Sequence, residues 1–158
     1  MLTLQVLPDG RIVSGGSDEK IIIWSKPVAG EWKPEVLEGH GGGVSTLQVL
    51  PDGRIVSGGR AGKIIIWTKS VSGEWMTKVL KGHQGGVLEL QVLPDGRIVS
   101  AGADKKLVIS TESESGEWTQ EVLEGSVSRV NTLQVLPDGR IVSGSDNGKI
   151  LIWDGDKV

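Results

Sequence analysis

The sequence predicts an all-β protein built from four tandem copies of one antiparallel four-stranded unit. The string LQVLPDGRIVS begins at Leu4, Leu47, Leu90 and Leu133, so the unit repeats every 43 residues without an insertion. Each copy alternates short runs rich in Val and Ile with turn residues, and no stretch keeps the apolar spacing of a helix. These two observations define the fold class before any single residue is considered.

The first copy shows how each element is predicted. Strands are expected over residues 4–7, 11–14, 20–24 and 32–37, where β-branched residues dominate or alternate with polar ones. Pro8-Asp9-Gly10 separates the first two strands, because Pro presets φ and Gly tolerates a positive φ in a turn. Pro34 lacks a backbone donor, which places the fourth strand at the edge of its sheet.

A period of about 40–45 residues with regular turn signals is typical of β-propellers, in which each repeat forms one blade. We therefore expect one array with blades over about residues 1–38, 39–81, 82–124 and 125–158. The fourth blade is expected to be incomplete, because the printed chain stops soon after its third strand. Asp154-Gly155 is a hairpin signal, so residues 156–158 are predicted to begin an outer strand.

Several short motifs resemble those of the WD-repeat propeller family. They are Gly39-His40 before a strand, Pro-Asp-Gly in the first hairpin, Ser14-Gly15-Gly16-Ser17-Asp18 after the second strand, and Trp24 at the end of the third. Trp153-Asp154 is the one literal Trp-Asp pair at this position. The resemblance covers essentially the whole chain.

The resemblance implies a hydrogen-bonded group of His, Ser, Asp and Trp in each blade, and here every blade lacks at least one member. The candidates are Ser14, Asp18 and Trp24 in blade one, His40, Ser57 and Trp67 in blade two, His83, Ser100 and Asp104 in blade three, and Ser143 and Trp153 in blade four. The departures are Ala61 and Asn147 for Asp, Ser110 for Trp, and Ser126 for His.

Composition narrows the function. The chain is 23% charged and 37% hydrophobic with a net charge of −3, which is typical of a soluble globular protein and disfavours nucleic-acid or membrane binding. It has no cysteine and no apolar run long enough to span a membrane, so a cytoplasmic location is the default expectation.

The loop His40-Gly41-Gly42-Gly43 has no accompanying G-x-S-x-G turn, and two histidines are too few for a metal site. We expect no enzyme activity, cofactor or metal.

The sequence therefore predicts a non-catalytic scaffold for self-assembly or protein interaction. Its interaction face is expected at the loops that carry Glu19, Arg60, Lys105 and Asn147. A lectin-like propeller that uses Trp32, Trp75 and Trp118 is the alternative, and the repeated Arg11, Arg54, Arg97 and Arg140 are a candidate anion-binding ring. Near-identical repeats without Phe or Tyr also suggest an engineered, ancestral-like or recently amplified half-propeller.

The family resemblance also implies an oligomer. Blades of this family are shaped for rings of about seven, so four would close only under strain. Two chains would supply eight blades, and we expect a homodimer of about 34 kDa, twice the 16.8 kDa chain.

Overall fold

The computed structural model describes residues 3–126 and 128–154. Over these residues the chain forms fifteen β-strands in four antiparallel sheets and contains no helix, which confirms the all-β array of blade-type sheets. None of the described segments is a helix with the length and apolarity needed to cross a membrane. The outer strand predicted over residues 156–158 lies outside the described residues.

Each sheet is one blade, with its strands in chain order from the first to the last. Blade one contains β1 (Thr3–Val6), β2 (Ile12–Gly15), β3 (Ile21–Ser25) and β4 (Lys33–Leu37); blade two contains β5 (Val44–Val49), β6 (Ile55–Gly59), β7 (Lys63–Lys69) and β8 (Trp75–Lys81). Blade three contains β9 (Val87–Val92), β10 (Ile98–Gly102), β11 (Leu107–Glu112) and β12 (Trp118–Leu123); blade four contains β13 (Val130–Val135), β14 (Ile141–Ser145) and β15 (Ile150–Trp153). Pro34 lies in the edge strand β4, as its missing donor predicts.

The Pro-Asp-Gly turn sets the register of the first two strands in every blade. In blade one, the Gly10 N–H donates to the Leu7 carbonyl at 2.9 Å, and Gly10 has a φ of 85° that a larger side chain would resist. The Asp9 carboxylate accepts from the Arg11 N–H at 3.1 Å and closes the turn. The same turn recurs at the equivalent positions of the other three blades.

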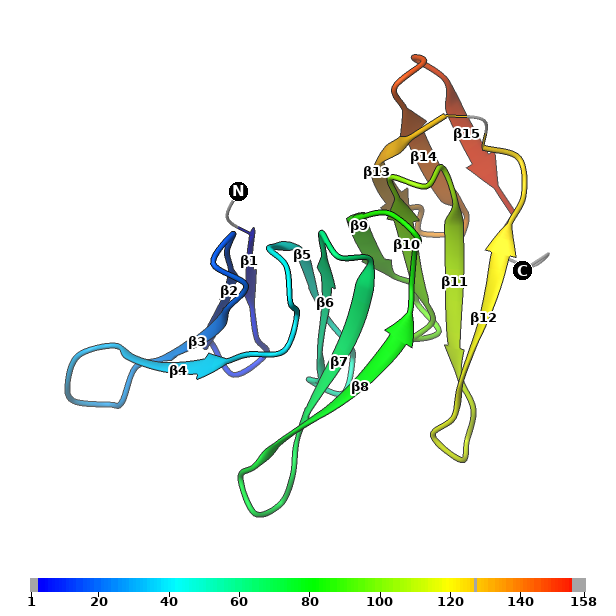
Figure 1. Ribbon diagram of the computed structural model, residues 1–158. Coiled ribbons are helices and arrows are strands. Elements are labelled where there is room, and N and C mark those ends of the chain that lie inside the picture. The colour runs from blue at the N-terminus through cyan, green and yellow to red at the C-terminus, as the bar shows by residue number, and fades with distance from the viewer. Residues whose placement is uncertain (1–2, 127, 155–158) are drawn as a thin grey trace.

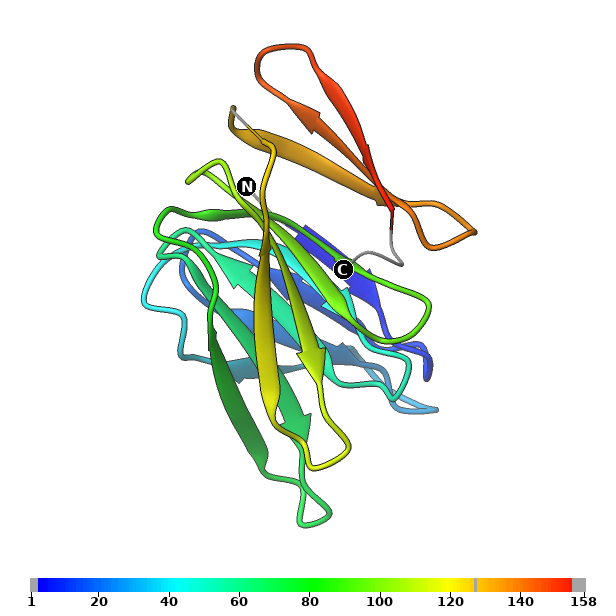
Figure 2. The ribbon, with the colours of Figure 1, turned by 90° about the vertical axis from the view of Figure 1, so that its right-hand side faces the viewer.

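The blades fan around a common axis (Figure 1). Their first strands, β1, β5, β9 and β13, are neighbours along the inside of the array. Their last strands point outward, and the hairpins after β3, β7 and β11 form the tips farthest from the inside (Figure 1). Figure 2 shows blade four, in orange and red, at one end of the array.

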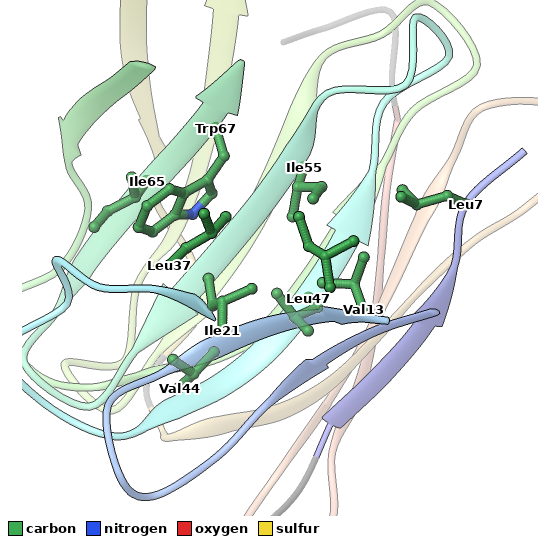
Figure 3. Close-up of a cluster of buried hydrophobic side chains, with 10 residues drawn as sticks. Leu7, Val13, Ile21, Leu37, Val44, Leu47, Ile55, Ile65 and Trp67 are labelled. Carbon is green, nitrogen blue, oxygen red and sulfur yellow. The ribbon is translucent and has the colours of Figure 1, made fainter. Parts of the chain in front are cut away.

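Apolar side chains fill the interface between neighbouring blades, here called a seam. The front face of a blade meets the preceding blade, and its back face meets the next one. Val13, Ile21 and Leu37 on the back of blade one pack against Leu47 and Trp67 on the front of blade two (Figure 3). Equivalent clusters fill the seams between blades two and three and between blades three and four. Burial of these side chains is the main force that holds the array together.

The two end faces of the array carry the same residues as the seams, but no other blade among the described residues covers them. Leu4, on the front of blade one, is 57% exposed, whereas its repeat equivalent Leu47 is 1% exposed. On the back of blade four, Ile150 is 71% exposed, whereas its equivalent Ile64 is fully buried. The array therefore ends in one uncovered front face and one uncovered back face.

Candidate functional site

A Ser–Trp hydrogen bond joins the second and third strands in three of the four blades. The indole Nε1–H donates to the serine Oγ at 3.0 Å in blade one, 2.7 Å in blade two and 2.9 Å in blade four, through Trp24 and Ser14, Trp67 and Ser57, and Trp153 and Ser143. The antiparallel register brings the two side chains onto the same face, because the tryptophan lies two residues beyond the serine's cross-strand partner.

Blade three holds a different set, built around His83. The His83 Nδ1 lies 2.8 Å from the Asp104 Oδ1, and the Nε2 lies 2.9 Å from the Ser100 Oγ. The other oxygen of Asp104 accepts from the Gln84 N–H at 3.0 Å. Burial alone would raise the pKa of Asp104, but the hydrogen bonds from His83 and from backbone N–H groups outweigh it and hold that pKa below its usual value. This network links the loop before β9 to the loop between β10 and β11.

In blade three, a glutamine from the outer strand supplies a hydrogen bond at the position where the other blades have tryptophan. Ser110 is fully buried at the tryptophan position, and the Gln120 Nε2 donates to its Oγ at 3.1 Å from the outer strand β12. Sequence reasoning missed this contact. A signal exists in the repeat itself, because position 120 is Gln in the blade that carries Ser110, and Pro34 and Thr77 stand there in the blades that keep the tryptophan.

Blade two has the histidine without its acid. The His40 Nε2 lies 2.6 Å from the Ser57 Oγ, but the buried Nδ1 finds no hydrogen-bond partner within residues 3–126 and 128–154. Ala61 stands where blade three has Asp104. Burial, and to a smaller extent the charge of Lys63, lower the pKa of His40 from 6.5 to about 4, so the ring is neutral at pH 7.

Asp18 and the two departures in blade four do not join such a network. Asp18 is exposed, and no hydrogen bond connects it to Ser14 or Trp24 in the described part of the chain. The Ser126 Oγ donates to the Ser128 carbonyl at 2.8 Å, and the Asn147 Oδ1 accepts from the Lys149 N–H at 3.1 Å. Both contacts are local and stabilise only their own loops.

These hydrogen-bonded groups connect loops and strands within their own blades. The histidines, serines and tryptophans are buried or half-buried, and the described residues contain no cluster of three or more metal-ligating side chains. A net contribution of about 1 kcal/mol per hydrogen bond is typical of such groups.

The four repeated arginines bind the aspartate of their own turn. The Nε donates to the Asp Oδ2 at 2.7–2.9 Å, from Arg11 to Asp9, Arg54 to Asp52, Arg97 to Asp95 and Arg140 to Asp138. Arg54 also reaches across a seam, and its Nη1 donates to the Glu112 Oε1 at 2.9 Å. The proposed anion ring therefore consists of guanidiniums that already have carboxylate partners.

The loops between the second and third strands carry the predicted interaction face. Glu19, Arg60, Lys105 and Asn147 are all exposed there. Arg60 lines a hollow of about 630 Å³ together with Arg129 and the half-buried Glu89, whose pKa is raised chiefly by burial. Glu19 and Lys105 both have a φ of 69°, a left-handed conformation that the equivalent Gly62 and Gly148 adopt without strain.

The tryptophans at the starts of the outer strands differ in burial. Trp75 packs against the cluster between blades one and two, and Trp118 packs against the cluster between blades two and three. Trp32, on the uncovered front of blade one, is 44% exposed. Two of the three tryptophans that the lectin-like alternative needs for sugar binding thus pack against buried side chains in the seams.

The repeated four-stranded sheets, the Ser–Trp bonds and the His–Asp network define a propeller-type repeat protein. The model of the WD domain, G-beta repeat family, matches residues 33–68, 75–109 and 118–154, more than half of the chain. The chain therefore belongs to the WD-repeat family. Each match runs from the outer strand of one blade through the third strand of the next. No curated protein matches the chain.

Proposed function

We propose that this chain is an interaction scaffold whose array closes by head-to-tail pairing with a second copy. Propellers of WD repeats generally serve as non-catalytic scaffolds for protein interaction. The proposal names a second, identical copy of the chain as its first binding partner.

One observation carries the pairing: the two uncovered faces are the two halves of a seam. The back of blade four presents Ile150 and Ile152, the equivalents of the buried Ile64 and Ile66 on the back of blade two. The front of blade one presents Leu4, the equivalent of the buried Leu47. Because these two surfaces already fit each other at three internal seams, the end faces of two copies are complementary.

Polar contacts that cross the internal seams support the same pairing. The Gln48 Nε2 donates to the Leu90 carbonyl at 3.0 Å, and the Gln91 Nε2 donates to the Leu133 carbonyl at 3.3 Å. The next glutamine of the series is the exposed Gln134 on blade four. In the proposed pairing, the Leu4 carbonyl of a second copy would lie opposite Gln134 and accept a hydrogen bond from its amide.

Two seams of this kind join two copies into a ring of eight blades. Covering apolar surface at about 25 cal/mol per Å² on both seams favours association, and the loss of translational and rotational freedom opposes it. The ring would present the exposed loops at Glu19, Arg60, Lys105 and Asn147 twice, as a face for further protein partners. The near-identical repeats also support recent amplification or engineering of a half-propeller.

The lectin-like alternative has less support, because Trp75 and Trp118 pack into seams rather than lining an open surface. A glycan array still distinguishes the two functions. Reproducible sugar binding that is lost in Trp75→Ala would favour the alternative.

Sedimentation equilibrium at micromolar concentration tests the pairing. The expected mass is about 34 kDa for the native chain, twice its 16.8 kDa. Leu4→Asp places a charge in the seam and should give a folded monomer. Val71→Asp, the matched control, changes a fully exposed residue at the tip of the hairpin between β7 and β8 and should leave the dimer intact. A native chain that stays at 16.8 kDa would overturn the pairing.

A further inference from the structure

The outer end of each seam contains a charged residue at the end of the third strand. This position is Lys26 in blade one, Lys69 in blade two and Glu112 in blade three. It faces the preceding blade and lies beside the tryptophan that starts the outer strand, as the pairing of Lys69 with Trp75 and of Glu112 with Trp118 shows. The two internal seams that carry it balance its charge in different ways.

The seam between blades two and three pairs an acid with an arginine. The Arg54 guanidinium binds both carboxylate oxygens of Glu112, at 2.9 and 2.5 Å, and its central carbon lies 5.9 Å from the centre of the Trp118 ring. Both charged side chains are mostly buried, with 22% and 27% exposure. Such a two-point Arg–carboxylate pair fixes the geometry as well as the charge.

The seam between blades one and two has a lysine at this position, and the acid comes from the other blade. The Lys69 Nζ lies 3.4 Å from the Glu35 Oε2 and 5.4 Å from the centre of the Trp75 ring. The Trp75 Nε1 donates to the other oxygen of Glu35 at 3.0 Å. Glu35 lies in β4, the outer strand of blade one, so this solution depends on the preceding blade having an outer strand.

The seam between two copies brings together a lysine, as in the seam between blades one and two, and an arginine, as in the seam between blades two and three. Shifting these contacts by whole repeats places Lys26 and Trp32 of one copy opposite Arg140 of the other, where Glu112 and Trp118 lie opposite Arg54. The described residues of blade four form three strands and do not include an equivalent of Glu35. The acids near Arg140 are Asp138 in its own turn and Asp154 in its own blade.

We propose that Lys26 sets the strength of the seam between copies. Trp32 of one copy covers Arg140 of the other, and the Lys26 ammonium lies beside the same guanidinium in place of a carboxylate. The two end faces therefore attract each other through apolar burial, but their outer end lacks the two-point Arg–carboxylate pair that joins Arg54 to Glu112. This inference rests on the proposed head-to-tail pairing and adds the residue that limits its affinity.

The test is the dissociation constant of Lys26→Glu, measured by sedimentation velocity over a dilution series. A carboxylate at position 26 reproduces the Glu112 arrangement in both seams of the ring, so the constant should fall by about tenfold. Lys81→Glu is the matched control: it makes the same charge change at the exposed end of β8, where Glu38 and Glu124 already occupy the equivalent positions of blades one and three. The control should leave the constant unchanged.

The salt dependence of the dissociation constant is a second readout, and it should differ between the native chain and Lys26→Glu. Raising the ionic strength should leave the native dimer nearly unchanged, because Lys26 forms no Arg–carboxylate pair in its seam. In Lys26→Glu the same change screens an attraction, so that dimer should weaken. Trp32→Ala should weaken both dimers while leaving the fold intact, because Trp32 is already 44% exposed in the single chain.

The outcomes separate this inference from the pairing itself. A native dimer whose dissociation constant is the same in Lys26→Glu and Lys81→Glu would overturn the role of Lys26 and leave the pairing standing. A native monomer that dimerises only in Lys26→Glu would support the role of Lys26 and overturn the homodimer as the native state. Monomers in all three proteins would overturn both.

Discussion

Leu4 and Leu47 occupy the same place in the repeated unit, with the same neighbours in sequence, yet one is exposed and the other is buried. The difference lies in the preceding blade: blade one covers the face that carries Leu47, and no blade among the described residues covers the face that carries Leu4. His40 and His83 differ for a similar reason, because a single acid, Asp104, accompanies only the second. In a repeat protein, the neighbours of a residue decide its energetic role as much as its own identity does.

The largest expected effect is the difference in stability loss between alanine substitutions at Leu47 and at Leu4. Leu47→Ala removes a buried side chain and should lower the free energy of unfolding by about 2–5 kcal/mol. Leu4→Ala should lower the stability of the single chain by less than about 1 kcal/mol, since its side chain is largely in water. Urea denaturation at a protein concentration below the dissociation constant measures both. Equal losses would mean that the front of blade one is covered within the single chain.

Burial also sets the titration of His40. The unfolded chain binds a proton at this ring near pH 6.5, whereas the folded chain resists it until about pH 4. The folded pKa is the lower of the two, so the unfolded chain binds this proton more readily than the folded chain. The free energy of unfolding is therefore unaffected by this ring above pH 6.5 and falls by up to about 3 kcal/mol as the pH is lowered toward 4. NMR titration of the two histidine rings measures this directly. A His40 ring that titrates near pH 6.5 would contradict its burial.

A transplant between blades tests why the two histidines differ. Ala61→Asp places an acid where blade three has Asp104, so the His40 Nδ1 gains a partner and the free energy of unfolding should rise by about 1–2 kcal/mol. The pKa of His40 should also rise. Ala61→Asn is the matched control, because its amide oxygen accepts the hydrogen bond without a charge and should stabilise the chain with a smaller rise in pKa. No change in either variant would mean that the orphaned Nδ1 has another partner.

The smallest expected effect concerns charge across an internal seam. Glu112→Lys puts a cation opposite Arg54 and should lower the stability of the chain by about 1 kcal/mol, more at low salt than at high salt. Glu114→Lys makes the same change on an exposed hairpin and serves as the control. Identical melting temperatures for the two variants would show that the Arg54–Glu112 pair adds nothing.

The strands and turns were predictable because repeated local signals determine them. Gly10 has the positive φ that its turn requires, and Pro34 lies at a sheet edge for lack of a donor. The observed strands fall within about one or two residues of the predicted ranges in blade one. Eleven identical residues per repeat carry this information four times.

The site was harder to predict because its contacts join residues far apart in sequence. The resemblance proposed Asp18 beside Ser14 and Trp24, but the aspartate stays exposed in its loop. Gln120 replaces an indole through a strand that the motif does not include, and Arg54 finds Glu112 in the next blade. These contacts depend on packing between strands and blades, which a pattern within one repeat does not contain.

Mass alone leaves two dimers open, since the exposed edge of β15 could also pair with the same strand of a second copy. A crystal structure of the assembled native chain distinguishes them directly. The account predicts a closed ring of eight blades in which the front of blade one, with Leu4 and Trp32, covers the back of blade four, with Ile150 and Arg140, at two equivalent seams. A dimer joined through β15, with Leu4 and Ile150 still in water, would contradict it.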